Sequence, residues 1–205
     1  AKRYEQVYSI VEPRWQPDDH RGLRTSPFHA RQEELGAEFY QSGGWESPQW
    51  YEHNADLVER YEDRIPEQDG WQAVNRSPIE AAEHLHTREK VSMFDMTSFA
   101  SIMVSGEGSG EFLQRLCSND IDIDVGQVRY SLLLNEGGGI LADVTVVRLD
   151  DEEYMVTTGG GNSPGIHGGW LADHAPPTVS VDVQEGAKST IGLWGPNARL
   201  LLQRC

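Results

Sequence analysis

A single carboxylate, Asp143, interrupts an otherwise apolar pattern in the middle of the chain. The stretch from Tyr130 to Leu149 predicts a β-hairpin, because an apolar run is followed by Asn135, a run of glycines and then a β-branched run. Asp143 stands just before that second run. A carboxylate entering a half-buried strand is costly to desolvate unless it is paired or used. Asp143 is therefore either an acid that stabilises the turn at the strand edge or a functional group, and its spacing alone does not decide between the two.

Aromatic residues near this hairpin suggest what the carboxylate could bind. Phe94, Phe99 and Tyr130 would form part of an apolar patch beside Asp143. A planar ligand that carries an amine could stack on such a patch and donate a hydrogen bond to the carboxylate. This chemistry is sensible, but it fits many ligands and identifies none of them.

The other glycine-rich and histidine-containing stretches lack the partners that their chemistry requires. The Gly106–Gly110 loop has no lysine, and Glu107 and Glu111 would repel a phosphate group. Thr157–Gly161 is equally weak as a ligand-binding loop and fits a turn. The histidines lack the spacing of a metal site, and there is no nucleophile elbow, Cys/His motif or dinucleotide fingerprint. We expect neither a metal site nor a covalent nucleophile.

The composition indicates a strongly acidic surface. The chain has 205 residues, with 33 Asp and Glu against 17 Lys and Arg, for a formal net charge of −16. Only three of the basic residues are lysines, and the acids are dispersed along the chain. Such a surface suits very high salt, where charge repulsion is screened, so we expect a halophilic source, with an ordinary acidic protein as the alternative. Without a basic patch, nonspecific binding to nucleic acid is disfavoured.

The sequence favours a cytoplasmic protein. A membrane span would need a run of about 18 apolar residues, which is absent. The N-terminal AKRYEQVYSI also lacks the apolar core of a secretory signal. Cys117 follows an apolar helical pattern and looks like a core thiol, and Cys205 is the last residue. Two such cysteines form no disulfide framework, which suggests a reducing compartment.

The residue composition of the chain changes near residue 77. Residues 1–76 are rich in aromatic and acidic residues with frequent Pro and Gly, so we expect a loop-rich segment with one helix around 54–64, whose rings pack on another domain. Ser77-Pro78 then predicts a helix that ends near residue 90. Beside the hairpin, we expect strands at 101–105, 153–158, 178–183 and 189–194, and short helices at 111–117 and 170–174. The predicted class is α+β, with a mostly antiparallel sheet and flanking helices.

Residues 79–205 resemble the aminomethyltransferase family, the glycine-cleavage T-protein fold. The matching features are His84, Arg88, the runs MFDMTSF, FLQRLCSND and GPNARLLL, Val104–Gly106, and above all NEGGGILADVTVVRL with Tyr130 five residues before its Asn. Residues 11–61, with VEPRW and LRTSPFHARQEELGAEFYQSGGWESPQWY, look like the segment that precedes this domain in sarcosine and dimethylglycine dehydrogenases.

This resemblance implies a folate-dependent transferase domain in a larger flavin enzyme. In that branch an FAD domain, here outside the chain, oxidises a methylated amine, and the domain resembled here transfers the one-carbon unit to tetrahydrofolate. Residues 1–76 would be a connecting segment at the end of the dehydrogenase part, and residues 77–205 the N-terminal half of the folate-binding domain. The chain lacks an initial Met and stops shortly after a predicted helix start at Gly195–Asn197. We therefore expect a fragment, inactive alone, that packs on a missing flavin domain and on the missing second half of the folate domain.

The resemblance also assigns roles to residues. Asp143 matches the family's catalytic carboxylate, which would orient the folate amine, take up its proton and stabilise cationic character during transfer. The position before it is Ala142, where the plain T-protein has a further Asp. The residues that would line the pterin pocket are Phe99, Tyr130, Thr145, Val147 and, by a weaker alignment, Thr158. The alternatives to a transferase function are a non-catalytic folate-binding or regulatory module of the same fold, and an acidic scaffold module.

Overall fold

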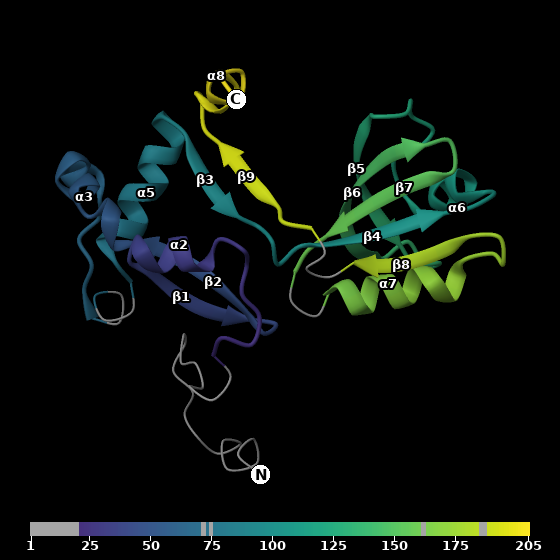
Figure 1. The fold of residues 1–205 in the computed structure, drawn as a ribbon, viewed down its shortest axis with the longest axis horizontal. Helices are drawn as coiled ribbons and strands as arrows, with labels where there is room; N and C mark the ends of the chain where they lie inside the picture. The colour runs from purple at the N-terminus through teal and green to yellow at the C-terminus, as the bar shows by residue number, and fades with distance from the viewer. Residues whose placement is uncertain (1–20, 71–72, 74–75, 161–162, 185–187) are drawn as a thin grey trace, which may run out of the picture. The chain divides into compact units, whose positions relative to one another are not determined.

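The computed structural model describes residues 21–70, 73, 76–160, 163–184 and 188–205. The chain divides into two compact units, one formed by Met93–Leu193 and the other by Ala1–Ser92 together with Trp194–Cys205. The α-helices and strands of both units are labelled in Figure 1. The division at residues 76 and 77 into a connecting segment and a folate-binding half-domain stays a prediction.

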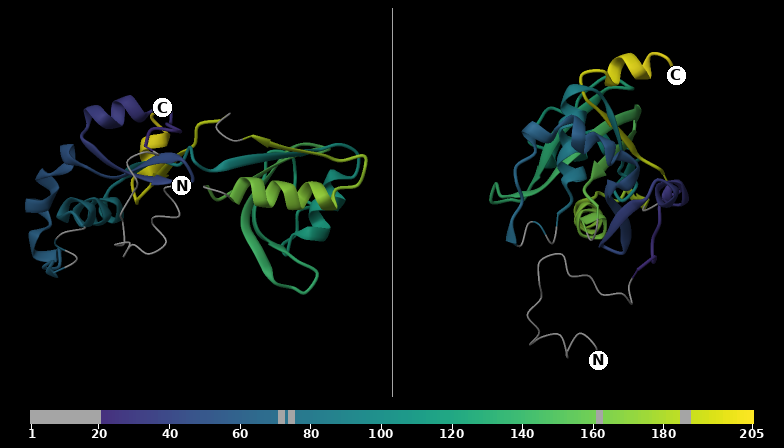
Figure 2. Two further views of the ribbon diagram at one scale, coloured as in Figure 1. Left: turned by 90° about the horizontal axis from the view of Figure 1, so that it is seen from below. Right: turned by 90° about the vertical axis from the view of Figure 1, so that its left-hand side faces the viewer.

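The unit Met93–Leu193 is built on a five-stranded sheet with the strand order β5-β6-β7-β4-β8. All four pairs of neighbouring strands are antiparallel. The strands are β4 (Ala100–Ser105), β5 (Val128–Leu134), β6 (Ile140–Asp150), β7 (Glu153–Thr158) and β8 (Ser180–Gln184). Two helices accompany them, α6 (Ser109–Leu116) and α7 (Ser163–His174), and α7 runs beside β8 and β4 (Figure 2). The predicted class, α+β with a mostly antiparallel sheet, is confirmed.

The two faces of this sheet differ in burial. Side chains alternate between faces along a strand, and β6 buries Ala142, Val144 and Val146. These pack with Phe112 and Leu113 of α6 in the hydrophobic core, which also takes in residues of α7. We call this side the core face. The opposite side, the open face, carries the side chains at the intervening positions, which include Ser101, Met103, Val128, Tyr130, Leu132, Asp143, Thr145, Val147, Glu153, Met155, Thr157 and Asp182.

A turn held by Asn135 joins β5 to β6. The Asn135 Oδ1 atom accepts hydrogen bonds from the backbone N–H of Gly137 at 3.0 Å and of Gly139 at 2.8 Å. Gly138 has a φ of +79°, a left-handed conformation that residues other than glycine rarely adopt. A Cβ on Gly139 would lie 2.9 Å from Asn135 Nδ2. The asparagine and these two glycines therefore fix the loop that sets the register of β6.

Helix α7 is longer than the sequence predicts. Its glycines suggested a helix of only five residues at 170–174, whereas the structure has twelve helical residues from Ser163. The reason is tertiary packing, because Gly168 is buried against β8. A Cβ on Gly168 would come within 2.2 Å of Val183 Cγ2, so glycine allows the helix to approach the sheet closely.

The other unit contains a hairpin and several short helices. Its elements are α2 (His29–Glu34), β1 (Ala37–Ser42), β2 (Trp45–Tyr51), η3 (Glu52–Asn54), α3 (Asp56–Arg60), η4 (Glu62–Arg64), α5 (Pro78–Glu89) and α8 (Ala198–Leu202). A two-stranded sheet of β3 (Ser92–Asp95) and β9 (Ile191–Trp194) lies where the chain passes between the units.

Local signals in this unit predicted some elements and missed others. Helix α5 begins as expected, with Ser77 Oγ accepting the backbone N–H of Ile79 at 3.2 Å. The helix expected over 54–64 is broken into η3, α3 and η4. The β1–β2 hairpin was not predicted, because its strands contain Pro48 and a bulge at Glu38/Phe39. Of the aromatic residues predicted to pack on another domain, those before residue 21 and Trp71 lie outside the described part of the chain.

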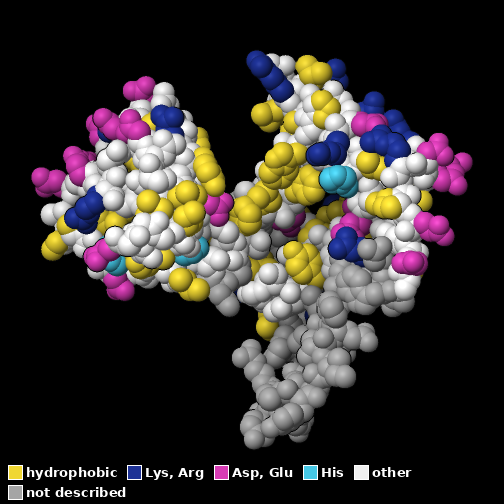
Figure 3. All heavy atoms as spheres, turned by 180° about the vertical axis from the view of Figure 1, so that it is seen from behind, with side chains coloured by type: hydrophobic (Ala, Val, Ile, Leu, Met, Phe, Trp, Pro, Cys, Tyr) yellow, Lys and Arg dark blue, Asp and Glu magenta, His cyan; other side chains and the backbone are white. Residues whose placement is uncertain are grey.

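Charged residues lie on the surface as the composition suggests. Acidic side chains are spread over the face shown in Figure 3 and are not gathered in one patch. Within the described residues, no helix is long and apolar enough to cross a membrane.

The close approach of α7 to β8 gives a test of the fold. Gly168→Ala should lower the free energy of unfolding by about 1–3 kcal/mol, because the added methyl group overlaps Val183 in a packed interface. The matched control is Gly169→Ala on the same helix, where a Cβ meets nothing within 4 Å. It should be neutral or stabilising by up to about 1 kcal/mol, through helix propensity. Urea unfolding of both variants measures the difference, and equal midpoints would contradict the packing described for Gly168.

The Asn135 turn gives a second test. Asn135→Ala removes the acceptor for two backbone N–H groups and should cost about 1 kcal/mol, with faster hydrogen exchange at Gly137 and Gly139. Asn135→Asp keeps an oxygen acceptor at the same place and serves as the control. Unchanged exchange rates in Asn135→Ala would show that the glycines hold the turn without the side chain.

Candidate functional site

The open face brings together four of the six residues that the sequence predicts for a site. Thr145 lies directly opposite Tyr130 of β5, and Asp143 lies opposite Leu132. Val147 follows on the same face, because it is two residues beyond Thr145. Directly opposed residues on one face of an antiparallel pair have side chains in contact range. Asp143, Tyr130, Thr145 and Val147 therefore form one continuous surface.

This surface combines an accessible carboxylate with an apolar wall. Asp143 is exposed, and Tyr130 keeps 59% of its surface accessible. Thr145 and Val147 are half-buried. No hydrogen bond or ion pair joins the Asp143 carboxylate to another residue in the described part of the chain. The turn is held by Asn135 instead, so the interpretation of Asp143 as a turn-stabilising acid finds no contact to support it.

Two of the predicted site residues lie elsewhere. Thr158 is 2% exposed and belongs to the core face, where it pairs with Ala100 and its Oγ1 lies 2.6 Å from Nδ1 of His167. Its side chain is thus on the other side of the sheet from Asp143. Phe99 is half-buried in the turn before β4, where its N–H donates to the Met96 carbonyl at 2.9 Å. Phe94 of the expected aromatic patch lies on β3, outside the five-stranded sheet.

The edge of the sheet beside Tyr130 is closed by the segment after α6. β5 is an edge strand, whose outer hydrogen-bonding groups need partners. Ser118 N–H donates to the Leu132 carbonyl at 2.9 Å, and Asn119 Nδ2 donates to the Tyr130 carbonyl at 2.9 Å. Asn119 N–H also donates to Ser131 Oγ at 3.1 Å. These contacts fix the strand that carries Tyr130 and Leu132.

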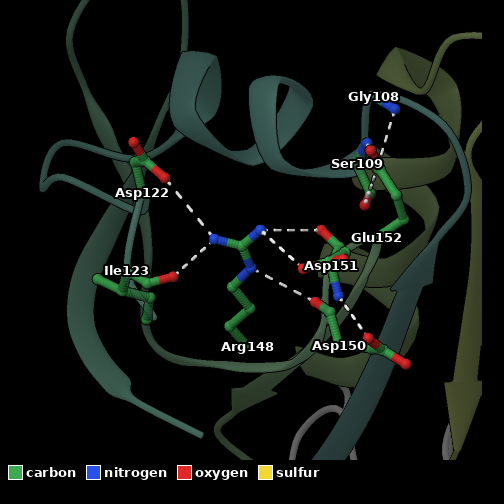
Figure 4. A network of polar contacts seen from close by, with 8 residues as sticks. All are labelled: Gly108, Ser109, Asp122, Ile123, Arg148, Asp150, Asp151 and Glu152. Atoms are coloured by element: carbon green, nitrogen blue, oxygen red, sulfur yellow. Dashed lines mark hydrogen bonds and ion pairs between the residues drawn. The ribbon is translucent and has the colours of Figure 1, made fainter. Parts of the chain in front are cut away.

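The far end of β6 is anchored by Arg148 (Figure 4). Its Nη1 donates to the Ile123 carbonyl at 2.7 Å, and its Nη2 donates to the Asp151 carbonyl at 3.2 Å. The guanidinium also lies 5.7 Å from the centre of the Tyr154 ring. In the same network, the Glu152 carboxylate accepts the Gly108 N–H at 3.0 Å at the start of α6. β6 is therefore held by Asn135 at one end and by Arg148 at the other.

A pocket of about 470 Å³ adjoins this network but shares no residue with the open face. It is lined by Gly110, Glu111, Gln114, Arg115, Ile121, Asp122, Arg148, Asp151, Glu152 and Tyr154. Burial, as the largest cause, raises the pKa of the Tyr154 hydroxyl above its ordinary value. Arg148 already donates to backbone carbonyls here, so this pocket gains no free cation from it.

Lys188 is a residue of the site that the sequence did not indicate. Its Nζ lies 3.5 Å from Met155 Sδ and 3.8 Å from Met103 Sδ, both on the open face. It comes from the segment between β8 and β9, so only the folded register reveals the contact. The one available signal was that Lys188 is one of just three lysines in an acidic chain.

The open face fits a flat ligand better than a metal ion. Among the described residues, no three His, Cys, Asp or Glu side chains are grouped so that they could hold a metal. The burial of the Cys117 thiol raises its pKa, which disfavours the reactive thiolate. An accessible carboxylate at the end of an aromatic and β-branched wall can instead orient an amine of a planar molecule.

Comparisons with known proteins agree on one family for this chain. The sequence model of the GCVT N-terminal domain matches residues 28–205. The chain is 31% identical over 198 residues to the 4-methylaminobutanoate oxidase (formaldehyde-forming) of Paenarthrobacter nicotinovorans, which covers 97% of this chain and 23% of that protein. It is 28% identical over 184 residues to the aminomethyltransferase of Chloroherpeton thalassium, covering 89% of this chain and 43% of that protein.

A solved structure gives the same result for the fold. The crystal structure of glycine cleavage system aminomethyltransferase T from Bartonella henselae matches with a TM-score of 0.68 and 29% identity, over 89% of this chain and 44% of that chain. The chain thus spans less than half the length of each of these relatives. The sequence match and the shared fold confirm the predicted resemblance, and the chain belongs to the GCVT N-terminal domain family, with an aminomethyltransferase-like fold.

Proposed function

We propose that this chain supplies one wall of a tetrahydrofolate site, at which a one-carbon unit is transferred to the folate. The observation that carries the proposal is the open face, where Asp143 stands at the end of a wall made by Tyr130, Thr145 and Val147. The family membership supports the choice of ligand, because aminomethyltransferases are the relatives that share this fold. When bound, the folate supplies the amine nitrogens that accept the one-carbon unit.

Asp143 is the residue to which we assign the catalytic role. Its carboxylate is accessible and is not engaged by other described side chains, so it is free to accept a hydrogen bond from a ligand amine. A carboxylate in that position orients the amine, receives its proton and favours positive charge beside it. Tyr130 and Val147 offer the aromatic and aliphatic surface against which a pterin ring would lie.

We also propose that the whole protein couples this transfer to oxidation of a methylated amine, as in sarcosine or dimethylglycine dehydrogenases. The similarity to 4-methylaminobutanoate oxidase supports this, because it extends over 97% of the chain and so includes most of the aromatic segment before residue 77. The sheet of the Met93–Leu193 unit is antiparallel and offers no parallel βαβ unit for a dinucleotide. FAD would therefore bind in a domain outside this chain.

A substitution of Asp143 tests the transfer step. In the full-length protein, Asp143→Asn should cut formation of methylene-tetrahydrofolate by roughly 10²-fold or more, because the amide cannot take up a proton. Oxidation of the amine should continue, so free formaldehyde should replace the folate product. Both products can be measured with sarcosine, dimethylglycine and 4-methylaminobutanoate as substrates, which also tests which amine is used.

The matched control is Asp173→Asn, an equal change of charge at an exposed position of α7 in the same unit. It should leave the product ratio unchanged. Transfer by Asp143→Asn at the rate of the unaltered protein would remove Asp143 from the mechanism. Folate binding without any transfer in the unaltered protein would favour a non-catalytic folate-binding module.

We further propose that the protein works in a cytoplasm of high salt. The net charge of −16 and the dispersed acids support this setting. Raising KCl from about 0.1 M to 2 M should increase the melting temperature by screening the repulsion among these charges. A melting temperature that falls over this range would contradict the proposal.

A further inference from the structure

Lys188 occupies an unusual place for a lysine in such an acidic chain. Its side chain is exposed, and its ammonium group approaches the sulfurs of Met103 and Met155. A thioether is a weak acceptor, whereas an ammonium group has three strong donors. Within the described residues, Lys188 forms no ion pair with a carboxylate, although acids outnumber bases by 33 to 17 in the sequence. The group therefore keeps its capacity to bind an anion.

The segment that carries Lys188 is fixed by the hydrogen bonds of Thr190. Two residues further on, the Thr190 carbonyl accepts the Met96 N–H at 2.9 Å, and the Thr190 N–H donates to Thr97 Oγ1 at 3.4 Å. Thr97 is 2% exposed. This pairing holds the segment beside the start of β4 and directs Lys188 over the open face.

We propose that Lys188 binds the carboxylate end of the folate whose amine end meets Asp143, and so acts as a specificity residue for the glutamate tail. This inference rests on the proposed function, because it takes reduced folate as the occupant of the open face. Asp143 and Lys188 belong to the same compact unit, so their separation is defined by the sheet.

The register gives the distance between the two charges. Met155 and Met103 lie in one row with Val147, which is four residues beyond Asp143 on β6. Four residues span about 13 Å along a strand, and neighbouring strands are about 4.8 Å apart. The ammonium group is therefore roughly 15 Å from the carboxylate, across the open face.

A reduced folate has the matching order of groups. Its pteridine amines lie at one end, the aminobenzoyl ring in the middle and the glutamate carboxylates at the other end. On the open face, the corresponding order is the Asp143 carboxylate, the apolar surface of Val147 with the Met103 and Met155 thioethers, and the Lys188 ammonium group. Thioethers make favourable contacts with aromatic rings. The Asp143 carboxylate thus matches the amine end of the ligand and the Lys188 ammonium group its carboxylate end, while Asp182 lies in the same row as Met103 and forms no ion pair with Lys188 among the described residues.

A double-mutant cycle on protein and ligand tests this pairing. The full-length protein and its Lys188→Met variant are titrated calorimetrically with tetrahydrofolate and with its bis-amide, in which both glutamate carboxylates are neutral. Methionine keeps the apolar stem but removes the charge. For the unaltered protein, we expect tetrahydrofolate to bind about twofold to fivefold more tightly than the amide, as for an exposed ion pair. Lys188→Met should bind both ligands with the weaker affinity.

The controls separate charge at this position from charge in general. Lys188→Arg should keep the preference for the carboxylate form, and Lys90→Met, at an exposed position after α5, should change nothing. A preference that persists in Lys188→Met would overturn the role of Lys188 while leaving the proposed function intact. Failure of the unaltered protein to bind tetrahydrofolate at all would overturn both.

Discussion

The alignment of β6 with its two neighbours is the constraint on which the candidate site depends. The side-chain period of a strand is two residues, so a shift of one residue would move every side chain to the other face. In the observed register Ala142, Val144 and Val146 fill the core, and Asp143 and Thr145 consequently stand on the open face. The burial of three apolar residues thus decides where the carboxylate points, without any contact to the carboxylate itself.

Both ends of β6 show how this register is maintained. The Asn135 side chain closes the turn before the strand, and Arg148 ties the strand's far end to the loop at Ile123. The neighbouring strand β5 is held at its outer edge by Ser118 and Asn119. Each of these polar groups satisfies backbone donors or acceptors, which would otherwise favour fraying at an edge.

Local patterns predicted the elements whose causes are local. The apolar runs on either side of the glycines gave the hairpin, and Ser77-Pro78 gave the start of α5, because turn and cap chemistry involve residues close in sequence. The full length of α7 was missed, since it depends on Gly168 meeting Val183 of a later strand. Thr158 was grouped with Asp143 by alignment, but the register of β7 turns its side chain toward the core. Lys188 was missed for the same reason, because its contacts arise only from the folded sheet.

The run that carries the family resemblance therefore combines residues that build the hairpin with residues that could bind the ligand. In NEGGGILAD, the asparagine and glycines build the turn and Ala142 faces the core, which leaves Asp143 as the member of the run with an accessible acidic group beyond the turn. A relative could keep the hairpin without the acid, and it would share the fold without the proposed reaction. Lys188 lies outside the motif, on a different segment of the chain. Recognition of the ligand's carboxylate end can thus vary among relatives while the strand that presents Asp143 stays the same.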